Sequence, residues 1–392
     1  MALLPDEARL LFLATRPDVV AQETYVAALA ASRPDWRAVG ALAEREKLMP
    51  VLWSAVRAHA EYIPAEVREA LRAQAAVTEF RMALTESALR QAVTVLEGAG
   101  IRVLLLKGAA LAATVYGSFT RRPMGDFDIL VPEGEAERAW AAMREAGWGL
   151  ELEGGEQFFD SHHHLPGLVD PKGLRLVLEI HRAMLPPTGP FLFDESELWH
   201  EARPLKLGAG EAWVPSDRHQ LLHLSVHFAW SHMFRGMGRT VRDIATILAS
   251  GPFDWPAFVE LADRTRARTC AYWTLAITRT LSGTAVPAEV LEALRPSQPL
   301  AVSHALERGY ITTGLFGACP SVWAAKLLWS AGIRPGASGH GSSRPWQTSE
   351  LFMRVFNLGE THGVGERLAG QLRSGARWWR FAKALGSPGR TM

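Results

Sequence analysis

The sequence has 392 residues, long enough for about two or three domains, and 48% hydrophobic residues can form sizeable cores. A net charge of +1 excludes an overall electrostatic field that would attract nucleic acid or a membrane surface. The two cysteines, Cys270 and Cys319, lack metal-type spacing and indicate a reducing, cytoplasmic setting. The N-terminus has no basic region typical of a signal peptide, and no uncharged apolar run reaches membrane-spanning length.

Residues 1–98 are predicted to form an N-terminal helical region. A long helix is expected to begin near Pro64 and to end at Gly98 and Gly100, because proline favours the first turn and glycine favours the end of a helix. The segment 85–96 within it is strongly amphipathic. We expect this apolar face to pack against the following domain.

Residues 99–215 are predicted to form a mixed α/β core. The apolar run that includes 103–106 indicates a buried strand, and the alanine-rich segment after Gly108 favours a helix. A second strand is expected to start at Asp126, and a third at 175–181. Segments 203–207 and 211–214 are short strand candidates around a glycine turn at 208–210.

Helical periodicity returns in residues 216–332, which are predicted to form a C-terminal helical domain. Residues 333–349 are rich in Gly, Ser and Pro and are expected to form a flexible loop or linker. The tail 350–392 combines basic residues with tryptophans. A terminal helix that buries its tryptophans is favoured there over contact with nucleic acid or an anionic membrane.

The most informative motif is Asp126-Phe127-Asp128, which is followed by three apolar residues. Alternation along a strand places both carboxylates on one face and Phe127 on the other. Adjacent carboxylates repel each other unless a cation lies between them, and their hard oxygen atoms suit Mg²⁺. Gly108, at the expected strand-to-helix junction, would let backbone N–H groups approach a phosphate. Together these features indicate nucleotidyl transfer.

Three runs together resemble a known family: Leu-Lys-Gly-Ala at 106–109, Arg-Pro-Met-Gly-Asp-Phe-Asp at 122–128, and Glu-Ile-His at 179–181. They are similar to the bacterial "uncharacterised nucleotidyltransferase" family of the DNA polymerase β-like nucleotidyltransferase superfamily, over roughly residues 30–290. The superfamily usually has Gly-Ser after the first strand. The Gly-Ser here, at 117–118, follows a helix-like segment instead, so Gly108 is favoured as the phosphate turn. The resemblance implies an α+β fold with a small mixed sheet and helical flanks.

The resemblance also implies roles for site residues. Asp126, Asp128 and Glu179 would hold Mg²⁺, or Mn²⁺ in its place, and Glu179 would help to deprotonate the acceptor. The phosphates of the donor would contact residues of the strand-to-helix junction and of the loop before Asp126, namely Lys107, Gly108, Ala109 and Arg122. Structural interpretations also stand: a solvated strand end for the aspartates, and a salt bridge to Asp126 for Lys107.

Several other polar residues are candidates for contact with the acceptor substrate, namely Arg121, His163, His164 and His181. For Arg121 a solvated loop charge is favoured, and His181 is equally consistent with a hydrogen-bonded structural histidine. His223 and His227 lie one helical turn apart, but no glutamate accompanies them as in a zinc protease, so a core or interface role is favoured. Arg242-Asp243 is interpreted as an interdomain salt bridge.

We therefore expect a Mg²⁺-dependent enzyme that transfers a nucleotidyl group from an NTP to a small-molecule, peptide or protein acceptor. Members of the resembling family tend to lie near natural-product and surface-polysaccharide genes, which implies a biosynthetic acceptor, and nucleic acid is not an expected partner. One alternative is the same fold acting on another phosphorylated donor, such as a nucleotide sugar. Another is a non-catalytic nucleotide-binding or antitoxin-like module that uses its helical flanks as an interface.

Overall fold

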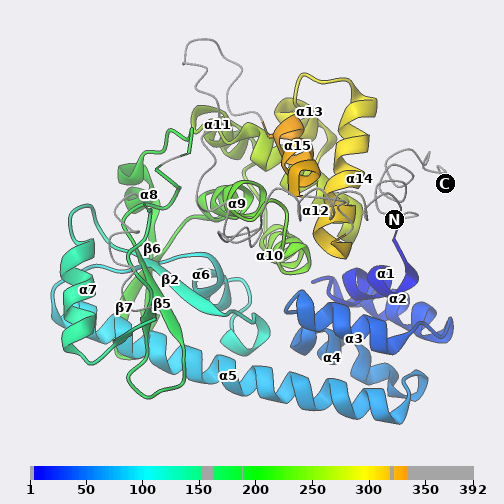
Figure 1. The fold of residues 1–392 in the computed structure, drawn as a ribbon, viewed down its shortest axis with the longest axis horizontal. Helices are drawn as coiled ribbons and strands as arrows, with labels where there is room; N and C mark the ends of the chain where they lie inside the picture. The colour runs from blue at the N-terminus through cyan, green and yellow to red at the C-terminus, as the bar shows by residue number, and fades with distance from the viewer. Residues whose placement is uncertain (1–3, 152–161, 188, 318–321, 334–392) are drawn as a thin grey trace, which may run out of the picture.

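The structure is a computed structural model that describes residues 4–151, 162–187, 189–317 and 322–333. Within these ranges the chain forms an α+β fold, with a mixed sheet between helical regions (Figure 1). The fold class predicted from the sequence is confirmed. Apart from Ile333, the expected linker 333–349 and the tail 350–392 lie outside the described residues.

The N-terminal helices are α1 (Asp6–Ala14), α2 (Val19–Ala31), α3 (Trp36–Arg45), α4 (Met49–Val56), η1 (Arg57–Tyr62) and α5 (Ala65–Gly98). The side chain of Asp35 caps α3 by accepting backbone N–H groups of its first turn. The 34-residue α5 begins after Pro64 and ends before Gly100, as predicted. One end of α5 lies beneath α3 and α4 and the other beneath the sheet (Figure 1). Its amphipathic segment buries Leu89, Val93 and Leu96 against the sheet domain.

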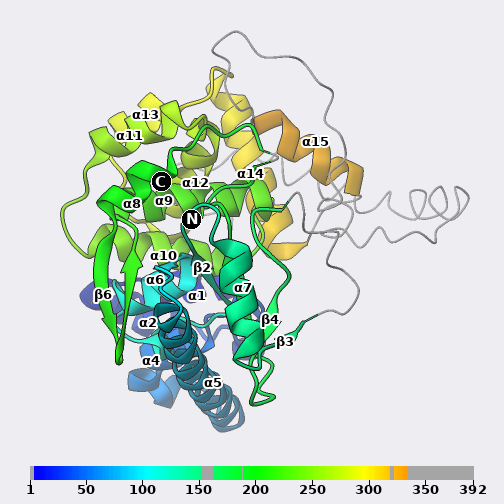
Figure 2. The same ribbon diagram turned by 90° about the vertical axis from the view of Figure 1, so that its left-hand side faces the viewer.

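The seven described strands are β1 (Leu104–Leu105), β2 (Asp126–Leu130), β3 (Gly149–Leu150), β4 (Leu168–Val169), β5 (Val177–His181), β6 (Arg203–Leu207) and β7 (Gly210–Val214). They lie in the order β3-β4-β5-β2-β1-β7-β6, so that β3 and β6 form opposite edges (Figure 2). Central β2 pairs antiparallel with β1 and parallel with β5. The first expected strand is a ladder of only two residues, because the chain turns into a helix directly after Leu106.

The remaining described helices are α6 (Lys107–Ala113), η2 (Phe119–Arg121), α7 (Ala136–Glu145), α8 (Glu195–Glu201), α9 (Asp217–Val226), the π-helix η4 (His227–Ser231), α10 (Met237–Ala249), α11 (Trp255–Arg264), α12 (Arg268–Ser282), α13 (Ala288–Leu294), α14 (Leu300–Phe316) and α15 (Val322–Gly332). Of these, α6 and α7 pack against strands of the sheet and the later ones pack largely on one another. Among the described residues, no helix combines the length and the apolar character needed to cross a bilayer.

The two faces of the sheet have different neighbours. Phe127, Ile129, Leu178 and Ile180 point into an apolar core that also contains buried residues of α5 and α7. Leu130 points the opposite way and joins the larger core formed by the helical regions. The polar side chains of β2 and β5 share this second face, so they look toward the C-terminal helices.

Candidate active site

Two parallel strands place the candidate carboxylates side by side. β2 and β5 pair in a register that sets Asp128 opposite Glu179 and Leu130 opposite His181. Since side chains alternate along a strand, Asp126 and Asp128 share one face, as the sequence predicted. Phe127 is completely buried on the other face, where it packs edge-on against Trp148 with ring centroids 6.0 Å apart. The apolar face therefore fixes the direction of the carboxylates.

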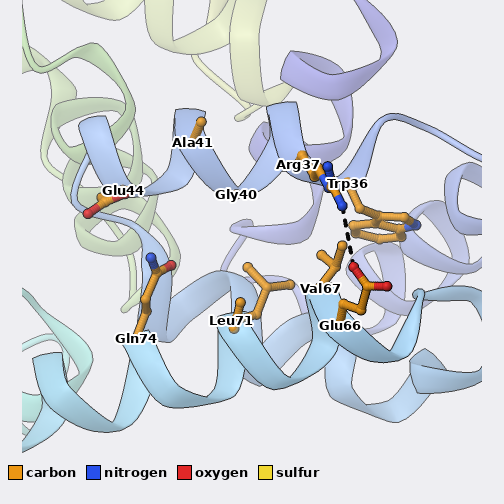
Figure 3. A pocket seen from close by; sticks show the side chains of 10 residues that line it. Trp36, Arg37, Gly40, Ala41, Glu44, Glu66, Val67, Leu71 and Gln74 are labelled. Atoms are coloured by element: carbon orange, nitrogen blue, oxygen red, sulfur yellow. Dashed lines mark hydrogen bonds and ion pairs between the residues drawn. The ribbon is translucent and has the colours of Figure 1, made fainter.

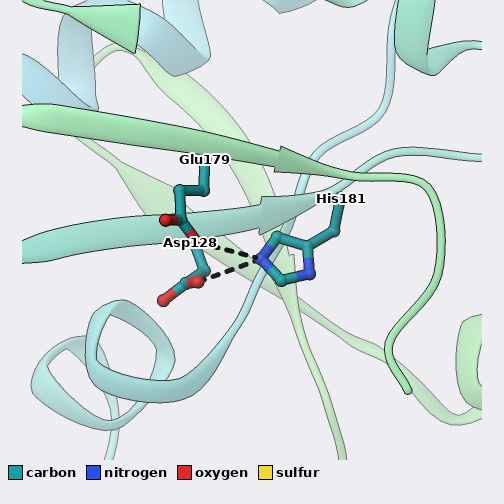
Figure 4. A group of neighbouring side chains, drawn as sticks. All are labelled: Asp128, Glu179 and His181. Carbon is teal, nitrogen blue, oxygen red and sulfur yellow. Dashed lines mark hydrogen bonds and ion pairs between the residues drawn. The ribbon is translucent and has the colours of Figure 1, made fainter. Parts of the chain in front are cut away.

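Asp128, Glu179 and His181 form a compact group. One ligand atom from each lies within 4.8 Å of the other two. The His181 Nε2 atom is 2.9 Å from Asp128 Oδ1 and 3.7 Å from Glu179 Oε2 (Figure 4). Asp126 lies on the same face of β2 but outside this group. The structure thus gathers His181 with two of the three carboxylates predicted to bind metal.

Lys107 supplies the positive charge nearest to this group. Its Nζ atom lies 2.6 Å from Asp128 Oδ1, and the two side chains are only 9% and 6% exposed. The sequence predicts contact of Lys107 with a phosphate or with the Asp126–Asp128 pair, and a salt bridge to Asp126 as the structural alternative; the observed partner is Asp128 of that pair. Burial opposes charge on both groups, but their attraction prevails: the pKa of Lys107 is raised, and the pKa of Asp128 is held well below its usual value.

The other two titrating groups respond to the same charges. Asp126 is an exposed residue at the start of β2. The surrounding protein still partly desolvates its carboxylate, and this desolvation, together with the negative charges of Asp128 and Glu179, raises its pKa. For His181, burial and Lys107 favour the neutral ring, but the hydrogen bonds to Asp128 and Glu179 outweigh them and raise its pKa. Its other ring nitrogen, Nδ1, is buried without a hydrogen-bond partner among the described residues.

The strand-to-helix junction differs from the prediction. Lys107 itself makes the turn, with φ at +44°, and Gly108 is the second residue of α6 with no positive φ. A Cβ atom on Gly108 would lie 2.7 Å from Arg122 Nη1, so the missing side chain makes room for a guanidinium group. The N–H of Ala109 donates to the carbonyl of Leu106 at 3.1 Å. We therefore correct the expectation that Gly108 and Ala109 form an open phosphate cradle.

Arg122 also has a different role from the one expected. Its Nε and Nη2 atoms donate to the two carboxylate oxygens of Asp243 at 3.0 and 2.6 Å, and Nη1 donates to the carbonyl of Pro123 at 3.0 Å. Both charged side chains are buried, at 6% and 1% exposure. Arg122 is thus a structural link between the sheet domain and α10, and the predicted phosphate clamp is a misassignment. Asp243 does form an interdomain salt bridge, with Arg122, while Arg242 donates to the carbonyl of Thr15.

The predicted acceptor residues separate into two places. His164 forms an isolated β-bridge with His181, and the His163 ring lies 5.0 Å from the His181 ring. Burial lowers the pKa of both loop histidines, so they are neutral at physiological pH. The side chain of Arg121 is exposed and forms no hydrogen bond or ion pair with the described part of the chain. This arrangement matches the solvated-charge interpretation of Arg121.

Several residues near the site come from the helical flanks. The sequence singled out His223 and His227 by their spacing, whereas no motif marks His232 or Arg239. His223, on α9, and His227, at the start of the π-helix η4, are predominantly buried, and burial lowers their pKa well below the usual value, with Lys107 the next contribution. His232 lies 4.2 Å, ring to ring, from His227. Arg239 on α10 is partly buried, and its charge acts on Asp126 and Asp128. π-Helical turns occur often at functional sites, which fits this location.

Two other features resemble sites but lie elsewhere. Glu197, Glu201 and His219 could ligate a metal by distance, but Arg218 and Arg264 already pair with the two glutamates. A second feature is a cavity of about 330 Å³ between α3 and α5, lined by residues that include Trp36, Arg37, Glu66 and Leu71 (Figure 3). None of its lining residues belongs to the carboxylate group.

The fold and the site together define a class. A mixed sheet in which two central parallel strands align carboxylates, next to a strand–Lys-Gly–helix junction, is a nucleotidyltransferase-type α+β arrangement. A family model described as "Uncharacterised nucleotidyltransferase" matches residues 32–283, more than half of the chain. The chain belongs to this family, which supports transferase chemistry. No curated protein shows significant similarity to the chain.

Proposed function

We propose that this protein transfers a nucleotidyl group from an NTP to a hydroxyl or phosphate group of a small-molecule, peptide or protein acceptor in a biosynthetic pathway. The observation that carries the proposal is the register of β2 and β5, which sets Asp128 and Glu179 side by side with His181 and Lys107 around them. Family membership supports the reaction class.

The donor set fits a divalent cation. Carboxylate oxygens suit Mg²⁺ or Mn²⁺, and Asp128 and Glu179 lie close enough to share one ion, to which His181 can add a ring nitrogen when it is neutral. Such an ion would compete with Lys107 for Asp128. Asp126 lies one alternation away on β2, where it can add a further oxygen. A bound cation of this type would neutralise the charge that develops on the phosphate oxygens during transfer.

The two central carboxylates can be given different tasks. Asp128 is held on both sides, by Lys107 and His181, and is only 6% exposed. Glu179 is 21% exposed, and the described residues show no Lys or Arg ion pair for it. Glu179 is therefore the group placed to accept the proton of the attacking acceptor hydroxyl, while Asp128 is the fixed ligand. The acceptor oxygen bonds to the α-phosphorus, the bond to the β-phosphate oxygen breaks, and pyrophosphate leaves.

Calorimetric titration of the four NTPs with and without Mg²⁺ tests this proposal. The informative variant is Glu179→Gln, which removes a charge without leaving a buried lysine unpaired. Glu211→Gln is its matched control, because Glu211 is an exposed residue of β7, toward the other edge of the same sheet. We expect Mg²⁺-dependent binding of at least one NTP to wild type and to the control, and its loss in Glu179→Gln.

Transfer is then followed with the α-³²P-labelled form of the NTP that binds, offered to candidate acceptors. Retention of the α-phosphate on an acceptor supports nucleotidyl transfer. If folded wild-type protein binds no NTP in either condition, the proposal is wrong, and a different phosphorylated donor or a non-catalytic role takes its place.

A further inference from the structure

Two cationic side chains from the helical flanks lie near Asp126, the exposed first residue of β2. Lys47 follows α3, and Arg239 lies in the first turn of α10. A Cβ atom on Gly125 would lie 2.9 Å from Lys47 Nζ, so the ammonium group sits against the residue that precedes Asp126. The charges of Lys47 and Arg239 act on each other and on Asp126.

The backbone next to these two residues is tied together. Glu46 is buried, and its Oε2 atom accepts the N–H of Gly238 at 2.9 Å. A Cβ atom on Gly238 would lie 2.8 Å from Glu46 Cβ, so the two segments are in direct contact. A carboxylate at the N-terminus of α10 is also favourable for the helix dipole. This contact holds Lys47 and Arg239 as neighbours.

Carboxylates act on the two cations only from a distance: Asp126 on both, and Asp243 and Asp128 on Arg239. Neither side chain forms a hydrogen bond or an ion pair with any residue that the structure describes. Burial and the charge of Arg239 lower the pKa of Lys47, and burial and Arg122 lower the pKa of Arg239. Like charges held together without a partner are unfavourable unless an anion joins them. Arg81 on α5 adds a third, exposed positive charge that acts on Lys47.

The backbone of Lys47 is also strained. Leu48 N–H donates to the carbonyl of Ala43 at 2.7 Å and Lys47 N–H to that of Glu44 at 3.0 Å, which is the Schellman ending of a helix. The position between the C-cap and Leu48 usually holds glycine, but here Lys47 occupies it with φ at +57°. The chain thus places a lysine where glycine would fit best.

From this geometry we infer that Lys47 and Arg239 form the binding site for the polyphosphate chain of the donor, at the end of β2 where Asp126 lies. The inference rests on the proposed function and deepens it, because it names the groups that hold the leaving pyrophosphate. An arginine fork and a lysine ammonium are the usual donors to phosphate oxygens. This site takes the place of the cradle that the sequence suggested at Gly108.

The test uses inorganic tripolyphosphate, in EDTA, titrated calorimetrically into the full-length chain. We expect wild type to bind it and both Lys47→Gly and Arg239→Gln to bind at least about tenfold more weakly, since each loses a charge-assisted contact. Lys47→Arg and Arg239→Lys should retain most of the affinity. Lys47→Gly should be at least as heat-stable as wild type because glycine relieves the positive φ.

The matched control is Arg266→Gly. Arg266 also ends a helix with φ at +60°, and the Ala267 N–H donates to the carbonyl of Ala262 at 2.8 Å in the same Schellman pattern. Arg266 is exposed and lies far along the chain from the site. This variant should gain stability in the same way and bind tripolyphosphate as wild type does.

Two outcomes separate this inference from the proposed function. If Mg²⁺-dependent NTP binding is present and equal in wild type, Lys47→Gly and Arg239→Gln, the inference is overturned and the proposed function stands. If tripolyphosphate binding depends on Lys47 and Arg239 but no NTP binds, the cationic site is supported and the donor is another polyphosphorylated molecule.

Discussion

The buried pair of Lys107 and Asp128 allows a double-substitution test of the site. Asp128→Asn removes the negative charge and leaves the Lys107 ammonium in a place where it is only 9% exposed. Lys107→Met removes the positive charge, but Asp128 then still has the His181 ring at 2.9 Å. The first change should therefore destabilise the fold more than the second, and the double variant Lys107→Met/Asp128→Asn removes both charges together.

The magnitudes follow from the geometry. At the 2.6 Å separation and an effective dielectric constant of about 20, the attraction is about 6 kcal/mol. Desolvation of the two ions offsets most of this, but removal of one partner exposes the desolvation cost of the other. Asp128→Asn should cost about 3–5 kcal/mol, and Lys107→Met about 1–3 kcal/mol. The double variant should be about 2 kcal/mol more stable than the sum of the single effects predicts.

Urea denaturation followed by circular dichroism measures the free energy of unfolding of wild type, the two single variants and the double variant. The four values can be compared if the unfolding free energy depends on urea concentration with the same slope in each protein. Magnesium-dependent NTP binding provides the second readout. It should be absent in Asp128→Asn and remain absent in the double variant, even where stability returns. If the free energy of unfolding of Asp128→Asn lies within about 0.5 kcal/mol of the wild-type value, or if the two single costs simply add, the buried ion pair does not stabilise the site.

Three further predictions concern single groups. Gly108→Ala should cost about 1–3 kcal/mol of unfolding free energy, because its Cβ would lie 2.7 Å from a guanidinium that Asp243 holds in place; thermal unfolding that matches wild type would contradict this. Burial lowers the pKa of His232 to about 4, so below about pH 6.5 the unfolded chain binds a proton that the folded chain excludes. The free energy of unfolding should therefore fall by up to about 3 kcal/mol toward pH 4. Urea titrations at each pH should show a weaker pH dependence in His232→Gln. Burial raises the pKa of the Cys270 thiol to about 12, so iodoacetamide should label Cys270, identified by peptide mass spectrometry, only after unfolding.

The sheet and its carboxylates were predictable because they depend on local alternation. Asp126-Phe127-Asp128 contains one buried ring between two acids, and that pattern fixes which face each side chain takes. Glu179 and His181 obey the same rule on β5. Their register with β2 is a non-local property: the resemblance implied only that Glu179 lies on a neighbouring strand, and the structure shows the pairing of Asp128 with Glu179. The sequence therefore predicted the shared face of these residues, whereas the observed group contains His181 and leaves Asp126 outside.

The phosphate-binding groups were not predictable in the same way. In the sequence alone, Gly108 is consistent with a phosphate turn. In the structure, Arg122 occupies the space beside Gly108 and pairs with Asp243, which lies on a helix 121 positions later in the chain. Lys47 and Arg239 carry no motif and come together only because Glu46 binds the start of α10. Such contacts between distant segments have no signature in local periodicity.

Strained backbone positions occur on the helical flanks as well as on the sheet domain. In the described part of the chain, seven non-glycine residues have positive φ, namely Arg33, Lys47, Lys107, Arg175, Met233, Phe234 and Arg266. Four of these lie on segments of the proposed site: Lys107 pairs with Asp128, Lys47 lies against Gly125, and Met233 and Phe234 directly follow His232. Strain of about 1–3 kcal/mol per residue persists only where packing imposes it. Phe234 is 1% exposed and stacks on Tyr310 with ring centroids 4.2 Å apart, so the aromatic core of the C-terminal helices holds this turn from behind. Packing thus positions the segment that carries His232 and leads into α10, the helix on which Arg239 lies.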